Sequence, residues 1–245
     1  MKTPEFLTAL PIAHRGLHDD TRPENGYGAF LAAIEHGFPI ETDVRFSADG
    51  RLVVFHDDGL SRMTGDERTP GECTATELKH LRLAGTNEQI PLLSELLKWV
   101  GGKVPLLIEI KNMKGVKPKR IARALAEALE GYTGEFAVQS FQPFYVKAFK
   151  KLRPDVPCGV LGTAEKGAAK GIQGYVIKRL PFNFLVRPDF ISYRLEDLPR
   201  KKTEKFKGVR LAWTVRSEKD FERARKVADN VIFEKFIPQT PTTIE

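Results

Sequence analysis

The chain has 245 residues, of which 41% are hydrophobic and 29% charged, and these values suit one globular domain over 1–245. No apolar run reaches the roughly 20 residues that a membrane span needs, so stable membrane insertion is not expected. Cys73 and Cys158 show no CxxC spacing, which argues against a zinc site or a disulfide framework. Because no signal-peptide core precedes the first motif, we expect a cytoplasmic protein.

The net charge is +7, and basic residues concentrate in Lys111–Arg123 and Arg200–Lys207. Such a charge attracts anionic substrates, membranes or nucleic acid. Charged runs are more often solvated helix faces, and no aromatic residues alternate with these basic residues to form a single-strand platform. We therefore expect a small anionic substrate and no nucleic-acid partner, whereas the sequence does not indicate the oligomeric state.

Short apolar runs with strand character alternate with amphipathic, helix-like segments along the chain. The predicted strands are Pro11–His14, Pro39–Phe46, Arg51–His56, Pro105–Lys111, Phe136–Phe141, Cys158–Gly162, Asp189–Arg194, Arg210–Val215 and Val231–Glu234. The predicted helices are Asn25–His36, Thr76–Leu83, Leu92–Val100, Lys119–Leu129, Pro143–Leu152 and Ser217–Val227. The stretch Gly162–Gly174 is rich in glycine but lacks phosphate-loop spacing, and we interpret it as a loop with a weak helix.

This alternation predicts an α/β protein with a parallel sheet, most economically a (β/α)8 TIM barrel. The Asp49-Gly50 pair predicts a hairpin that joins Pro39–Phe46 to Arg51–His56. The polar stretch Asp57–Ile90 then forms a small insertion after the second barrel strand. A doubly wound open sheet is the alternative, which the lack of a GxGxxG motif after the first strand disfavours.

Three carboxylates fall on two predicted strands. Glu41 and Asp43 are two residues apart, so both side chains point to one face of their strand. Two buried carboxylates on one face repel each other unless a cation lies between them. Glu109 on the next strand completes a set of three oxygen ligands, which suits one divalent cation, Mg²⁺ or Ca²⁺, rather than zinc. The alternative is a structural ion network with Arg45 or Lys111.

Two histidines follow apolar strand residues on either side of this acidic pair. A lone histidine in such a setting is more often a packed residue, but His14 and His56 flank a carboxylate cluster. Imidazole titrates near neutrality, so one ring can accept a proton while the other donates one. We favour His14 as the base and His56 as the acid. His18, His36 and His80 lack such settings and are expected on the surface or in loops.

Several further side chains are candidates for binding or orientation. Arg15 and Lys111 provide cations for phosphate oxygens, the first through a bidentate guanidinium. Glu24 is positioned to orient His14 or Arg15, and Asp57 to orient His56; Asn25 is a candidate cap of the first predicted helix. Trp213 and Phe141, on late strands, either line the substrate pocket or pack in the core.

In five motifs the chain resembles the glycerophosphodiester phosphodiesterase family. The motifs are HRG at His14–Gly16, PEN at Pro23–Asn25, ETD at Glu41–Asp43, FHDDGLSRMTG at Phe55–Gly65 and IEIK at Ile108–Lys111. Their order and spacing also agree, and weaker matches at Gln139–Phe141 and Ala212–Val215 extend the resemblance over nearly the whole chain.

The resemblance implies a TIM barrel with an insertion after the second strand. It also implies metal ligands at Glu41, Asp43 and Glu109, an acid/base pair at His14 and His56, and phosphate contacts from Arg15 and Lys111. Two departures stand out. Gly26 follows PEN where a threonine is usual, and the last strand reads VIFEKF where a Thr-Asp pair is common. The second departure leaves open what the eighth barrel strand contributes.

The function predicted from these residues is metal-dependent hydrolysis of glycerophosphodiesters to an alcohol and glycerol 3-phosphate. The attacking group is either water or the neighbouring glycerol hydroxyl, and the second route passes through a cyclic phosphate. A related lysophospholipase D or a phospholipase-D-like lyase acting on lipid phosphodiesters is the main alternative. A non-catalytic barrel and a nucleic-acid-binding protein are weaker ones. The alcohol on the phosphodiester stays open.

Overall fold

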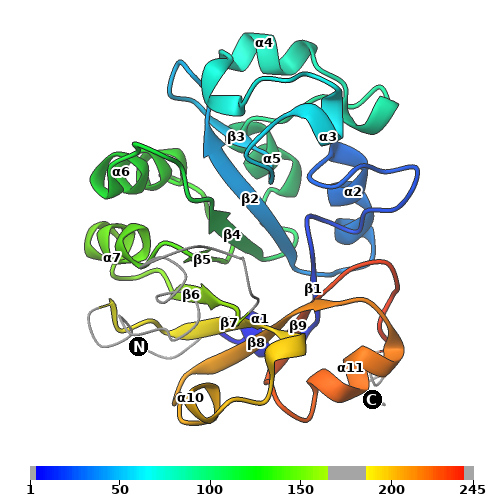
Figure 1. The fold of residues 1–245 in the computed structure, drawn as a ribbon, viewed down its shortest axis with the longest axis vertical. Helices are drawn as coiled ribbons and strands as arrows, with labels where there is room; N and C mark the ends of the chain where they lie inside the picture. The colour runs from blue at the N-terminus through cyan, green and yellow to red at the C-terminus, as the bar shows by residue number, and fades with distance from the viewer. Residues whose placement is uncertain (1–3, 165–185, 240–245) are drawn as a thin grey trace.

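In a computed structural model, parallel strands form a closed barrel with helices around it (Figure 1). The structure describes residues 4–164 and 186–239. The strands in this part of the chain are β1 (Ile12–Ala13), β2 (Ile40–Phe46), β3 (Leu52–Val54), β4 (Leu106–Ile110), β5 (Phe136–Ser140), β6 (Cys158–Gly162), β7 (Phe190–Arg194), β8 (Val209–Val215) and β9 (Asn230–Phe233).

The barrel closes through its first strand. The order of the strands is β1-β9-β8-β7-β6-β5-β4-β2-β3, and β1 also pairs with β2 through Ala13 and Ile40. Every one of these pairings is parallel except the hairpin of β2 with β3. Eight parallel strands therefore form the wall, and β3 extends it on the outside as the predicted hairpin arm. Gly50, at φ +78°, provides the turn of that hairpin.

Helices cover the outside of this wall. The helical segments are α1 (Phe6–Ala9), α2 (Tyr27–Glu35), α3 (Ser61–Thr64), η1 (Pro70–Glu72), α4 (Ala75–His80), η2 (Leu83–Gly85), α5 (Leu93–Val100), α6 (Pro118–Ala128), α7 (Pro143–Leu152), η3 (Leu195–Asp197), α10 (Lys201–Glu204) and α11 (Glu218–Ala224). The buried faces of α2, α5, α6, α7 and α11 pack on outward-facing strand residues in one continuous apolar layer. Among the described residues, none of these helices combines the length and the apolar character required to cross a membrane.

A second apolar cluster fills the barrel interior at its N-terminal end. Phe6 and Leu7 of α1 pack there against inward-facing strand residues such as Phe190. The side-chain amide of Asn230, at the start of β9, donates to the carbonyl oxygens of Leu7 and Leu10 and so fixes α1 at this end. The N-terminal end is therefore closed by apolar side chains, and the polar inward-facing residues lie toward the opposite, C-terminal end.

The insertion after the hairpin has a small apolar cluster of its own. Its members come from β3, from the short helices that follow and from the segments next to them, and they are Val53, Phe55, Leu60, Met63, Cys73, Leu78, Leu83 and Ile90. In Figure 1 these helices (α3 and α4) lie at the top of the molecule, beyond the upper end of β2.

The predicted fold class is confirmed by this architecture. The eight predicted barrel strands all occur within one residue of their expected bounds at each end. Helix α2 begins two residues later than expected, at Tyr27, and its N-cap is Gly26 rather than Asn25. Of the stretch Gly162–Gly174, the part from residue 165 onward lies outside the described residues.

The packing of the barrel interior is testable at Gly159 of β6. A Cβ atom placed there would lie 2.1 Å from the ring of the fully buried Phe190. We expect Gly159→Ala to lower the free energy of unfolding by about 1–3 kcal/mol, because the core must shift to accept the methyl group. Chemical denaturation measures this change. Gly59→Ala is the control, since no atom lies within 4 Å of the added Cβ there, and equal stability of the two variants would contradict the packing described.

Candidate active site

Three carboxylates meet inside the C-terminal half of the barrel. Glu41 and Asp43 project inward from β2, and Glu109 projects inward from β4. The register of the two strands pairs Asp43 with Glu109 directly. All three side chains are buried, and one oxygen atom from each lies within 4.8 Å of the others. The alternation of strand residues and the parallel register thus bring together the three predicted ligands.

The electrostatics of this cluster indicate a missing positive charge. Burial raises the pKa of Glu41 well above its usual value, and the neighbouring Asp43 and Glu109 raise it further. Asp43 Oδ1 and Glu109 Oε1 are buried and accept no hydrogen bond of acceptable geometry. Lys111 Nζ lies 3.4 Å and 2.9 Å from these two atoms. A divalent cation among the three carboxylates would satisfy both oxygens and allow all three groups to ionise.

Arg15 is a second cation beside the cluster, in contact with Glu41 and Asp43. The Arg15 backbone N–H donates to Glu41 Oε2 at 3.2 Å, and its Nε lies 3.6 Å from Asp43 Oδ2. Arg15 also donates through Nη1 to Glu24 at 2.7 Å, so the expectation that Glu24 orients this side chain agrees with the geometry. Arg45, by contrast, turns away to pair with Asp58, and it takes no part in an ion network with the cluster.

Asn25 has a different place from the one expected. It is buried, its side-chain amide donates to Asp43 Oδ2 at 3.0 Å, and its Oδ1 accepts from the Thr42 hydroxyl at 2.8 Å. Its φ of +57° is a conformation that asparagine tolerates better than most residues. The prediction that Asn25 caps the first helix is therefore wrong, because its side chain points into the barrel and fixes a carboxylate there.

His14 lies between the cluster and the last strand. Its Nδ1 is 2.5 Å from Glu234 Oε2, and its Nε2 is 3.9 Å from Glu41 Oε2. Burial and the adjacent Arg15 lower the pKa of His14 to about 4, although Glu234 opposes them. The ring is therefore neutral near pH 7. With Nδ1–H donated to Glu234, the unprotonated Nε2 faces the carboxylates.

Glu234 is the residue that the sequence reasoning missed. It directly follows β9, at the position where the family's usual Thr-Asp pair is absent. Its second oxygen accepts from Arg216 Nε at 2.7 Å, and His18 Nε2 lies 3.5 Å from Oε2. His18 is in a loop, as expected, and it forms a partly buried group with His14 and Glu234. A carboxylate at the end of a barrel strand was the available signal.

His56 follows the hairpin arm and lies close enough to Asp43 to contribute to the lowered pKa of that carboxyl group. Its Nδ1 is 2.6 Å from Asp57 Oδ1, which fits the expected orienting role of Asp57. Arg62 of the insertion bonds both Asp57 and Glu24. The insertion therefore ties the support of His56 to the carboxylate that holds Arg15.

The two late aromatic residues pack against each other. The rings of Trp213 on β8 and Phe141 after β5 are 5.6 Å apart, edge to face. Trp213 contacts the apolar cluster of the barrel interior, and its buried Nε1 has no hydrogen-bond partner within residues 4–164 and 186–239. An unpartnered indole donor inside the barrel is consistent with either expectation, core packing or substrate contact.

Comparison with known proteins agrees with these features. The model of the glycerophosphoryl diester phosphodiesterase family matches residues 14–234. The chain belongs to this family. A glycerophosphodiester phosphodiesterase of Caldanaerobacter subterraneus subsp. tengcongensis is 33% identical over 244 residues, which cover 92% of this chain and 94% of the relative. The enzyme class expected from the sequence, a glycerophosphodiester phosphodiesterase, is thereby confirmed.

Solved structures of phosphodiesterases have the same fold. The glycerophosphodiester phosphodiesterase of Thermotoga maritima superposes with a TM-score of 0.71 at 26% identity, over 91% of this chain and 94% of that one. A phosphodiesterase of Oleispira antarctica, solved with its product sn-glycerol-3-phosphate, gives 0.77 at 24% identity, over 91% of each chain.

The position of Glu234 leads to a prediction for this phosphodiesterase. The Glu234 carboxylate orients His14 and opposes the lowering of its pKa. Glu234→Gln removes this charge, so the pKa of His14 should fall further. We expect kcat/KM to drop by roughly 10–100-fold, the usual cost of losing an orienting partner, and the acid limb of the pH–rate profile to move to lower pH. Glu196→Gln, which removes a carboxylate paired only with Arg194, is the control. An unshifted acid limb with normal activity would contradict the role of Glu234.

Proposed function

We propose that this phosphodiesterase hydrolyses glycerophosphodiesters to an alcohol and glycerol 3-phosphate with one bound divalent cation. The observation that carries the proposal is the meeting of Glu41, Asp43 and Glu109 within 4.8 Å. Two imidazoles, each held by a carboxylate, accompany this cluster. A small anionic diester is the substrate that such a set of groups fits. We also expect the protein to act in the cytoplasm, without binding nucleic acid.

The donor set favours a hard cation. Three carboxylates without a thiolate or imidazole in the same group suit Mg²⁺ or Ca²⁺, and the two unsatisfied buried oxygens of Asp43 and Glu109 fit as ligands. When bound, such a cation supplies Lewis-acid stabilisation of charge on a phosphoryl oxygen. The alternative, a structural ion network, is less well supported. Among the described residues, the two cations Arg15 and Lys111 face three carboxylates, so they do not balance the charge.

Arg15 and Lys111 are proposed to hold the phosphate. Both side chains are largely buried beside the cluster, where a guanidinium and an ammonium interact strongly with an anion because little water screens them. Glu24 fixes the Arg15 guanidinium in place before substrate arrives. The charge that develops on the phosphoryl oxygens during reaction is then met by groups that need not reorganise.

His14 is proposed as the general base. Its Nδ1–H is donated to Glu234, and its lowered pKa of about 4 keeps Nε2 unprotonated near pH 7. Nε2 therefore accepts the proton of the attacking hydroxyl group, which belongs to water or to the neighbouring carbon of glycerol. The Glu234 carboxylate then stabilises the imidazolium that forms.

His56 is proposed as the general acid. Its Nδ1 donates to Asp57, whose own pKa is lowered because its bonds to His56 and Arg62 outweigh burial. The ionised Asp57 holds the His56 ring so that a proton on Nε2 can pass to the leaving alcohol oxygen. Trp213 is proposed to contact the substrate through its unpartnered indole N–H.

The acid/base assignment is tested by removing each ring. We expect His14→Ala and His56→Ala to lower kcat by roughly 10²–10⁴-fold, the usual contribution of general acid–base catalysis. The measurement is turnover of glycerophosphodiesters at saturating substrate. His80→Ala is the matched control, because His80 is exposed and bonds only the Thr76 carbonyl oxygen of its own helix. Near-normal rates for either site variant would refute the assignment.

Cation dependence is tested by metal removal. A chelator should abolish turnover because the crowded carboxylates lose their counter-charge, and added Mg²⁺ or Ca²⁺ should restore it. Glu109→Gln should weaken cation binding roughly 10-fold or more, as measured by calorimetric titration of the metal-free protein. Full activity after chelation, together with an absence of cation binding, would leave the structural ion network as the explanation of the cluster.

A further inference from the structure

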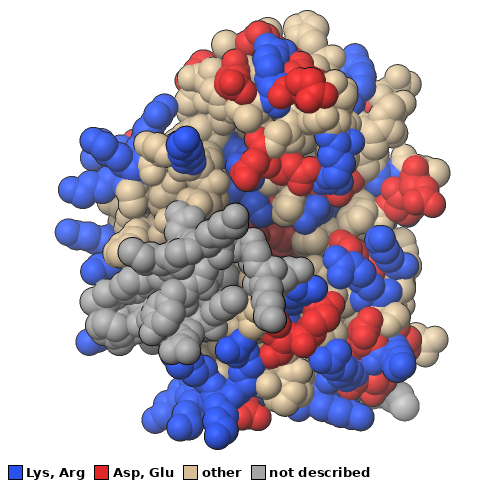
Figure 2. All heavy atoms as spheres, viewed as in Figure 1, with Lys and Arg blue, Asp and Glu red and all other residues tan. Residues whose placement is uncertain are grey.

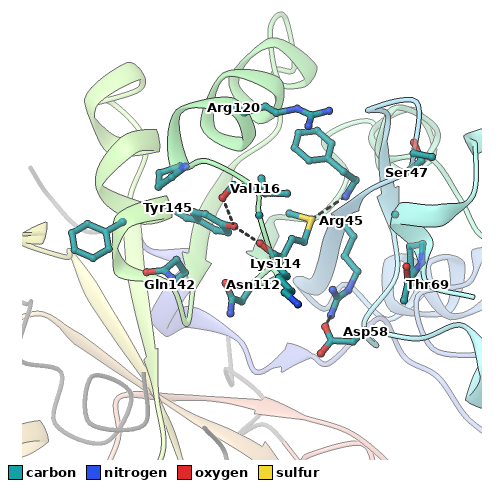
Figure 3. A pocket seen from close by; sticks show the side chains of 18 residues that line it. Arg45, Ser47, Asp58, Thr69, Asn112, Lys114, Val116, Arg120, Gln142 and Tyr145 are labelled. Carbon is teal, nitrogen blue, oxygen red and sulfur yellow. Dashed lines mark hydrogen bonds and ion pairs between the residues drawn. The ribbon is translucent and has the colours of Figure 1, made fainter. Parts of the chain in front are cut away.

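A large cavity lies beside the site, between the insertion and the start of α6. Its volume is about 890 Å³, well above what a phosphate group needs. Arg45 and Ser47 at the end of β2 and Thr69 of the insertion line one side of it. Asn112 and Lys114 after β4 line the other side, and Figure 3 shows these side chains around the common space.

The cavity is lined by direct neighbours of the site residues. Arg45 is two residues beyond Asp43 on the same face of β2, so the wall of the cavity begins where the metal cluster ends. Arg45 Nε and Nη2 donate to the His56 carbonyl oxygen at 3.0 Å and 2.7 Å. The opposite wall begins at Asn112, the residue after Lys111. Arg45 and Asn112 thus connect the cavity to the site, the first through its bonds to the His56 carbonyl oxygen and the second as the chain neighbour of Lys111.

The charges that line the cavity are mainly positive. Arg45, Lys114 and Arg120 contribute cations, whereas Asp58 is the one carboxylate among the described residues that line it. Asp58 is ion-paired with Arg45 at 2.7 Å. The wider surface has the same sign, because Lys and Arg side chains gather over α6 and α7 on the left of the molecule (Figure 2). An anionic group is attracted to such a place and a cationic group is repelled.

The Phe46 ring in the cavity does not offer an open face to a quaternary ammonium group. The Arg120 guanidinium lies 4.9 Å from the centre of the Phe46 ring and covers the face that would otherwise attract such a cation. The Tyr145 hydroxyl donates to the carbonyl oxygens of Met113 and Val116 at 3.2 Å and 3.1 Å. These bonds hold the loop that carries Lys114 in place at the edge of the cavity.

We infer that this cavity receives the leaving alcohol and selects alcohols that are rich in hydroxyl groups and carry a negative charge of their own. The inference rests on the proposed function, in which His56 protonates the leaving oxygen. Asn112 and Gln142 provide amides for the hydroxyl groups, and Lys114 and Arg120 attract the additional charge. Phosphorylated inositol and phosphorylated glycerol have this chemistry, whereas choline has the opposite charge.

The test is a comparison of leaving groups on one glycerophosphate. We expect kcat/KM to fall in the order glycerophosphoinositol phosphate, glycerophosphoinositol, glycerophosphocholine, by at least about 10-fold from first to last. The ratio of the first value to the last should shrink as salt is raised, because exposed charges are screened. A lysophosphatidylcholine is included because apolar side chains such as Phe144 also border the cavity.

Charge variants connect this preference to the cavity. The double variant Lys114→Gln with Arg120→Gln should reduce the ratio of kcat/KM for the anionic substrate to kcat/KM for the choline substrate by roughly 5–10-fold. Lys119→Gln is the matched control: it removes a charge from the same helix, but Lys119 does not line the cavity. For Lys119→Gln this ratio of kcat/KM values should equal that of the unmodified protein. Circular dichroism and thermal unfolding establish that both variants are folded.

The outcomes separate the two proposals. Hydrolysis of all the diesters with no anionic preference, or an unchanged ratio in the double variant, would refute the cavity's selectivity while leaving the proposed function intact. Preference for the lysolipid would likewise refute it, since the cavity would then receive an acyl chain. If no glycerophosphodiester is hydrolysed in the presence of Mg²⁺ or Ca²⁺, the proposed function fails and the inference fails with it.

Discussion

Mutual repulsion among Glu41, Asp43 and Glu109 is the constraint on which the site depends. Burial leaves the three groups little water to disperse their charge, and it raises the pKa of Glu41 together with the neighbouring Asp43 and Glu109. Arg15 and Lys111 offset part of the charge, but two carboxylate oxygens still accept no hydrogen bond. A protein selected for stability alone would fill this space with apolar residues, as the opposite end of the barrel does.

The barrel makes this arrangement possible because its parallel strands all end at one opening. Alternation along β2 directs Glu41 and Asp43 inward, and the register with β4 places Glu109 beside them. Residues that are 220 positions apart, His14 and Glu234, meet because β1 pairs with β9 when the sheet closes. The rigid wall fixes the ligands, while the loops and the insertion contribute Arg62 and the support of His56.

The parts of this architecture that follow from local pattern were predictable. Strand periodicity predicted the barrel, and spacing along single strands predicted the set of three carboxylates. The structure brings these carboxylates together, whereas their roles stay predictions. What was missed depends on contacts between distant segments. Asn25 was interpreted as a local helix cap although its side chain turns inward to Asp43. Glu234 and His18 have no motif of their own, and only closure of the barrel brings them to His14.

The insertion connects catalysis to the recognition of the leaving group. Arg45 continues the inward face of β2 beyond the carboxylates, bonds the backbone of His56, and borders the cavity. A change in the cavity that moves Arg45 would therefore also move the proposed acid. Arg62 adds a second connection, because it bonds the Asp57 that orients His56 and the Glu24 that orients Arg15. The proposed selection of the alcohol and the proposed donation of its proton would thus depend on bonds made by two arginines, Arg45 and Arg62.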